Sequence, residues 1–189
     1  MKQQQLLEVY EQVLTHYKAC YFDQSKLSDT WIHTLEQKGR VYSIDDMVRM
    51  RAPGSKVTSW ICDSAYLVDG SIIDLRDVIT ARLLDLGESD FGCPDRNIRV
   101  NGGAYSGQFL KMVGITSHVI QLLEAAGNSE PRVIEIGGGV GIIPYLLRRY
   151  YGDRLTFFAV EIPESLMIQE WYLRNSLHDV PFTYASVPG

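Results

Sequence analysis

The chain has 189 residues, 46% of them hydrophobic, which is enough to bury a sizeable core in one domain or in two small ones. Its formal net charge of -5 and its scattered lysines and arginines argue against a nucleic-acid partner, and no run approaches the roughly 20 apolar residues that span a bilayer. Three widely spaced cysteines and the lack of a signal-peptide pattern lead us to expect a cytoplasmic protein with neither a disulfide framework nor a metal site.

The first part of the chain, residues 1–100, is predicted to be a mostly helical region of its own. Apolar residues recur there at the three- and four-residue spacing of an amphipathic helix. The predicted helices cover Leu6–Tyr17, Trp31–Leu35, Met47–Met50 with Ser43 as N-cap, and Ser71–Leu84 ending at Gly87. His16 falls in the first of them and is expected to be a surface residue.

The segment from Phe91 to Gly107 is rich in glycine, proline, asparagine and aspartate, which favour turns. It is either a plain connecting loop or a loop that closes over a substrate, because loops set by a rigid scaffold often carry binding residues. Helical periodicity returns over Tyr105–Leu123, and Gly127 is expected to end that helix.

Strands and helices are predicted to alternate in the last third of the chain. Short apolar runs rich in β-branched residues read as strands, and stretches with helical spacing lie between them. In order, the elements are a strand over Arg132–Ile136, a helix over Ile142–Tyr151, a strand over Leu155–Val160, a helix from Pro163 and a strand over Pro181–Tyr184. Such alternation favours parallel strand pairing with right-handed crossovers.

The turn after the first of these strands is the strongest functional signal. Glycine occupies positions 137, 138, 139 and 141, and Glu161 ends the next strand. Parallel neighbours emerge at the same edge of a sheet, where ligands of open α/β sheets bind. Glycine lets the main chain approach a ligand, and Glu161 can accept hydrogen bonds from both ribose hydroxyls. If the ligand is a nucleoside that carries a methionine group, Glu135 would lie near the charged amino group of that methionine.

Spacing distinguishes between two kinds of nucleoside cofactor. The dinucleotide fingerprint is Gly-x-Gly-x-x-Gly. Starting from Gly137 and Gly139, the sixth position is Ile142, while the third glycine comes one residue earlier. The loop is therefore not shaped for a pyrophosphate, and we expect S-adenosylmethionine (SAM). An oxidoreductase that uses NAD or a nucleotide sugar is the first alternative.

Two motifs resemble those of a known class of enzymes. Glu135-Ile136-Gly137-Gly138-Gly139-Val140-Gly141 looks like the first motif of class I SAM-dependent methyltransferases, and Val160-Glu161-Ile162-Pro163-Glu164 looks like the second. More narrowly, these motifs with Ser165-Leu166 and Tyr172-Leu173 are similar to a family of sugar O-methyltransferases. That family commonly has an aspartate at the position of Glu161, so the chemistry of the side chain is kept.

The resemblance implies a fold, a reaction and a set of contacts. Residues 101–189 would be the N-terminal half of a Rossmann-like SAM-binding domain, a β-α-β-α-β unit, and the enzyme would transfer a methyl group to a hydroxyl of a sugar or similar small molecule. The cofactor contacts would be Glu135, Gly137, Gly138, Gly139, Gly141, Glu161, Ile162 and Tyr105. The resemblance gives no catalytic base, and His118 reads as a packed or surface residue.

The end of the chain coincides with the end of the expected third strand, so we expect a fragment of a longer enzyme. In that class the first strand is flanked by a fourth, and without it an apolar sheet edge and face would be left uncovered. Self-association through that edge is then expected. The second alternative function is a non-catalytic remnant that binds a nucleoside or a protein partner.

Overall fold

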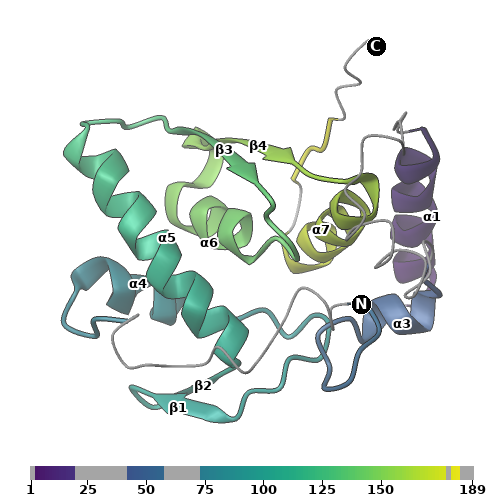
Figure 1. The fold of residues 1–189 in the computed structure, drawn as a ribbon, viewed down its shortest axis with the longest axis horizontal. Helices are drawn as coiled ribbons and strands as arrows, with labels where there is room; N and C mark the ends of the chain where they lie inside the picture. Colours follow the sequence, from purple (N-terminus) through teal and green to yellow (C-terminus); the bar gives the residue numbers. More distant parts are fainter. Residues whose placement is uncertain (1–2, 20–41, 58–72, 178–179, 184–189) are drawn as a thin grey trace, which may run out of the picture.

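A computed structural model describes residues 3–19, 42–57, 73–177 and 180–183, and shows a mixed α/β protein. A parallel strand pair, β3 and β4, lies along one side of the helices, and a separate hairpin, β1 and β2, lies at the opposite side (Figure 1). The elements are α1 Gln3–Ala19, α3 Ile44–Val48, α4 Val78–Leu86, β1 Ile98–Val100, β2 Gly103–Tyr105, α5 Gly107–Ala125, β3 Arg132–Ile136, α6 Ile142–Tyr151, the 3-10 turn Gly152–Arg154, β4 Thr156–Val160 and α7 Pro163–Ser176.

The strands β3 and β4 are parallel and in register from Arg132 opposite Thr156 to Ile136 opposite Val160. Helix α6 connects them, so the predicted β-α-β unit is confirmed. The predicted strand over Pro181–Tyr184 is wrong for its described part, because residues 180–183 form no strand. Phe182 instead lies under the guanidinium of Arg174 in α7, with 4.8 Å between Cζ and the ring centroid. In the described residues the larger sheet of a Rossmann-like fold is therefore not seen.

One face of this strand pair is apolar and open. Helices α6 and α7 lie on one side of the pair (Figure 1). Alternate residues point to opposite faces of a strand, and exposure alternates along both β3 and β4. The exposed apolar residues form the open sheet face: Ile134 (67% exposed), Ile136 (80%), Phe158 (53%) and Val160 (53%). A parallel sheet normally has both faces covered, so the expectation of an uncovered apolar face is confirmed for these residues.

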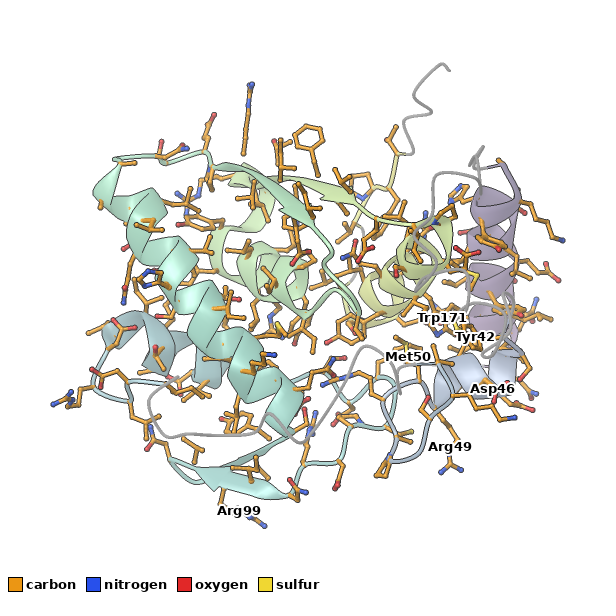
Figure 2. The ribbon with its side chains drawn as sticks, in the orientation of Figure 1. Tyr42, Asp46, Arg49, Met50, Arg99 and Trp171 are labelled. Carbon is orange, nitrogen blue, oxygen red and sulfur yellow. The ribbon has the colours of Figure 1, made fainter. Side chains whose placement is uncertain are left out.

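The core lies on the other side of the strands, around α7. Trp171 is fully buried, and its Nε1 donates to the Met47 carbonyl at 2.9 Å. In Figure 2 its label stands beside those of Tyr42 and Met50, which are buried in the same hydrophobic cluster. Tyr10 of α1 meets the Trp171 ring edge-on, with 5.8 Å between centroids. Helix α7 thus links the N-terminal helices to the strand pair.

The predicted helix over Ser71–Leu84 begins later than expected. Residues 71 and 72 lie outside the described part, and α4 starts only at Val78. The Asp77 side chain accepts a hydrogen bond from Thr80 N at 2.7 Å and caps the helix there. Asp74 accepts from Arg76 N at 3.0 Å, a local bond that competes with helix formation. Gly87 ends α4, as predicted.

A hairpin lies where the sequence indicated only a loop. Strands β1 and β2 pair antiparallel, with Val100 opposite Gly103. Asn101 and Gly102 form the turn with φ of 47° and 80°. Asn-Gly is the strongest short hairpin signal, because both central residues of a type I′ turn need positive φ.

The other predicted helices in the described ranges are present, but two have different bounds: α3 covers Ile44–Val48 and not Met47–Met50, and α5 begins at Gly107 because Tyr105 belongs to β2. Helix α1 covers the first periodic stretch, and Ser43 caps α3 by accepting from Asp46 N at 3.1 Å. Helix α5 is closed by Gly127, whose N–H donates to the Glu124 carbonyl at 2.9 Å. The helix predicted over Trp31–Leu35 lies outside the described residues. None of the helices in the described ranges combines the length and apolarity that crossing a bilayer requires.

Candidate functional site

The glycine turn connects β3 to α6 and holds its main chain in conformations that side chains disfavour. Gly137, Gly139 and Gly141 have φ of 77°, 60° and 96°. A residue with a Cβ would pay about 1–2 kcal/mol at each of these positions. Gly141 is the N-cap residue of α6, so the backbone N–H groups of the first helical turn open toward this loop.

Close packing also requires glycine at two positions of the turn, Gly138 and Gly141. A Cβ on Gly138 would overlap the Oε2 atom of Glu135 and lie 2.8 Å from Nε2 of Gln169. A Cβ on Gly141 would lie 2.6 Å from Cγ of Gln169. The side chains of Glu135 and Gln169 therefore cross directly over the glycine turn.

Glu161 joins the end of β4 to the same turn. Its Oε1 accepts a hydrogen bond from Gly139 N at 3.0 Å, and its Oε2 accepts from Ile162 N at 3.3 Å. The pairing of β3 with β4 continues past the strand ends, since Gly137 N donates to the Val160 carbonyl at 3.2 Å. The two sequence motifs thus meet at one sheet edge, as predicted. A carboxylate has about four acceptor positions, so Glu161 can still accept bonds from a ligand.

Glu135 has an altered ionisation. Its side chain is half-buried on the helix-covered face of β3, and burial raises its pKa from 4.5 to about 7, with Glu161 as the second cause. The Gln169 amide acts in the opposite direction by donating to Glu135 Oε2 at 3.4 Å. Two neighbouring carboxylates at a strand edge disfavour anions and favour a ligand group with positive charge.

The other two predicted cofactor contacts, Ile162 and Tyr105, lie in different surroundings. Ile162 follows Glu161 directly and is the N-cap residue of α7, so it belongs to the rim of the site. Tyr105 contacts α4 and α5: its hydroxyl donates to the Leu84 carbonyl at 3.1 Å, and its ring stacks on Phe109 with 5.5 Å between centroids. These contacts account for Tyr105 as a packing residue, and its contact with a cofactor stays a prediction.

Gln169 is the site residue that sequence reasoning missed. It lies seven residues after Ile162, two helical turns on, and therefore on the face of α7 that starts at the strand end. A buried glutamine in an otherwise buried stretch of a helix is a signal, because buried polar groups need partners. Periodicity alone could not show that its partner is Glu135.

A second buried polar cluster ties down the segment 91–107. The Glu88 carboxylate is fully buried and is paired with the guanidinium of Arg51. It also accepts from Ser106 N at 2.7 Å and Ser106 Oγ at 2.5 Å, at the N-cap of α5. Arg51 N in turn donates to the Gly92 carbonyl at 2.7 Å. This network fixes where the segment lies.

The described residues include two histidines, His16 in α1 and His118 in α5. His118 is exposed on α5, which is the second of the two predicted alternatives, a packed or a surface residue. His16 was expected at the surface, but its Nδ1 lies 2.8 Å from Oε1 of the buried Glu170 in α7. Its role is to hold α1 against α7. Among the described residues, no three His, Cys, Asp or Glu side chains form a cluster that could hold a metal ion.

Comparison of the chain with models of protein families, with curated proteins and with solved structures gives no match.

Proposed function

We propose that this chain binds SAM at the glycine turn and is part of a Rossmann-like methyltransferase that acts on a hydroxyl of a sugar or similar small molecule. The observation that carries the proposal is the hydrogen bond from Gly139 N to Glu161 Oε1, beside the Glu135 carboxylate. It joins a glycine turn and an acid at the carboxyl ends of adjacent parallel strands, where α/β sheets bind nucleosides.

The residues of the turn suit the three parts of the cofactor. A Cβ on Gly137 would meet no atom within 4 Å, so a ligand can lie against the main chain at this glycine. The Glu161 carboxylate would accept hydrogen bonds from the two ribose hydroxyls while keeping its hydrogen bond from Gly139 N. Glu135 would pair with the ammonium group of the methionine part. Ile162, next to the acid, would contribute apolar surface for the base.

The division of work between protein and cofactor follows from this arrangement. Bound SAM supplies a methyl group already activated by the sulfonium. The chain's own task is to orient that group and to keep water away, because holding two reactants in the right geometry can lower the barrier by about 7–11 kcal/mol. On binding, the Glu135 carboxyl would release its proton, since an adjacent ammonium group favours the carboxylate.

A dinucleotide fits the same residues less well. Ile142 stands where the dinucleotide fingerprint has its third glycine, and this isoleucine is buried at the start of α6. A pyrophosphate beside Glu135 and Glu161 would meet two carboxylates, and like charges at short distance repel. Both observations favour SAM over NAD.

Calorimetric titration of the folded chain with S-adenosylhomocysteine (SAH) and, separately, with NAD tests the proposal. We expect saturable SAH binding that Glu161→Ala removes and that Glu130→Ala, at an exposed carboxylate in the turn before β3, leaves unchanged. NAD binding without SAH binding would support the oxidoreductase alternative. A folded chain that binds neither would contradict the proposal and leave the non-catalytic remnant.

A further inference from the structure

Gln169 occupies an unusual place for a neutral polar side chain. It is 4% exposed, in the middle of α7, among residues that form the hydrophobic core. Such burial is tolerated when the amide makes hydrogen bonds, because an unpaired amide in an apolar environment is unfavourable. The bond that accounts for the position of Gln169 is the one to Glu135.

The side chain of Gln169 follows the glycine turn along its length. Its Cγ stands over Gly141, and its Nε2 stands over Gly138 and 3.4 Å from Glu135 Oε2. Because an ionised carboxylate only accepts hydrogen bonds, the NH₂ end of the amide must face Glu135. The stem of Gln169 therefore defines the space over the turn, and its end defines where the carboxylate points.

The charge on Glu135 depends on a small set of groups. Burial and the neighbouring carboxylate of Glu161 disfavour the ionised form, while the amide of Gln169 favours it. These groups come from β4 and α7, the elements that meet β3 at the turn. A change at Gln169 thus acts on the state of Glu135 as well as on its orientation.

We propose that Gln169 is a positioning residue, which orients Glu135 over the glycine turn and favours its carboxylate form, the form that pairs with the ammonium group of the ligand. The ligand in this statement rests on the proposed function, whereas the effect on Glu135 belongs to the ligand-free protein. Gln169 itself need not touch the cofactor.

The first test needs no ligand. In the chain labelled with ¹³C at glutamate carboxyls, the titration of Glu135 is followed by NMR in the wild type and in Gln169→Met, which keeps the length of the side chain and removes the amide. We expect the midpoint of Glu135 to rise by about one pH unit, since hydrogen bonds to charged groups are among the stronger ones. Gln5→Met, at an exposed position of α1, should leave it unchanged.

A second measurement uses the wild type alone and so does not depend on how the variant folds. The side-chain amide signals of Gln169 should shift with the same midpoint as the Glu135 carboxyl. Amide signals that do not respond to pH in this range, or a Glu135 midpoint that stays or falls in a folded Gln169→Met chain, would overturn the proposal.

The pH dependence of SAH affinity extends the test to the ligand. At pH 7 we expect Gln169→Met to weaken binding by roughly fivefold, because a pKa of Glu135 that rises by one unit from about 7 lowers its ionised fraction from about a half to about a tenth. The loss should shrink above pH 9, where Glu135 is ionised in both proteins. A loss of the same size at every pH would indicate a merely structural role and contradict the proposal. Absence of SAH binding by the wild type would refute the proposed function, and the NMR titration would still decide the role of Gln169.

Discussion

Replacement of Glu135 by glutamine should stabilise the protein at alkaline pH while removing ligand binding. The pKa of Glu135 is raised from 4.5 to about 7, chiefly by burial and then by Glu161, so the folded chain holds a carboxylate at an unfavourable place when the pH is above 7. Glutamine has the size of the protonated acid and no charge. The variant therefore removes the electrostatic penalty and keeps the packing.

The size and sign of the change in the free energy of unfolding follow from the linkage between protonation and folding. Between pH 4.5 and about 7 the folded state binds more protons at Glu135 than the unfolded state, so stability falls as the pH rises through this window and stays lower above it. A rise of this size corresponds to about 3 kcal/mol. Because the side chain is only half-buried, solvent screening reduces the expected gain for Glu135→Gln at pH 8 to about 1–3 kcal/mol. At pH 4 the two proteins should be equally stable.

Urea unfolding at pH 4, 6 and 8 measures this difference, with free energies obtained by linear extrapolation. Glu130→Gln serves as the control, because it makes the same chemical change at an exposed carboxylate. It should not alter how the free energy of unfolding depends on pH between pH 4.5 and 7. A Glu135→Gln chain that is less stable than the wild type at pH 8, or a difference that does not vary with pH, would refute the reasoning.

Five other substitutions, two of them matched controls, have clear expectations. Glu88→Ala leaves the buried guanidinium of its partner without a counter-charge and should cost about 3–5 kcal/mol in urea unfolding, whereas Asp90→Ala removes an exposed ion pair and should cost less than about 1 kcal/mol. Gly138→Ala should weaken SAH binding in calorimetry, because the new Cβ displaces the side chains of Glu135 and Gln169. In the control Gly137→Ala the Cβ meets no atom within 4 Å but φ is 77°, so the variant should mainly lower the free energy of unfolding, by about 1–2 kcal/mol. Ile136→Thr on the open sheet face should reduce concentration-dependent light scattering and change the free energy of unfolding by less than about 0.5 kcal/mol.

Each of these expectations has a contrary result. Equal losses for Glu88→Ala and Asp90→Ala would mean that the buried pair is solvated. Tight SAH binding by Gly138→Ala would mean that the site does not depend on the side chains above this glycine. Unchanged light scattering in Ile136→Thr would show that the open sheet face is not where copies of the chain associate.

Local chemistry in the sequence was enough for most of the second half of the fold. The strand Arg132–Ile136 and the helix Ile142–Tyr151 were predicted with the bounds that the structure has. Both rest on interactions within a few residues: a β-branched run, glycines that allow positive φ, and Gly152 after the last helical turn. The hairpin at Asn101-Gly102 was missed although its signal is equally local.

The expected third strand shows where such reasoning fails. Residues 181–183 have the composition of a strand, but a strand forms only when a neighbour offers its hydrogen bonds, and Phe182 packs on Arg174 instead. The predicted start of α4 is also wrong, because Asp74 accepts a local hydrogen bond from Arg76 N and Asp77 caps the helix only at Val78.

For the candidate site, the sequence by itself determined the residue types: a glycine turn with an acid before it and an acid at the end of the next strand. Only the tertiary structure decided what those residues do to one another. Gln169 and Glu135 are 34 positions apart, and their contact exists because α7 packs across the turn. The raised pKa of Glu135 and the exposure of Ile136 likewise depend on which elements cover each face. Periodicity shows which side of a strand is apolar, but burial and the proximity of charges depend on distant segments that a local pattern does not contain.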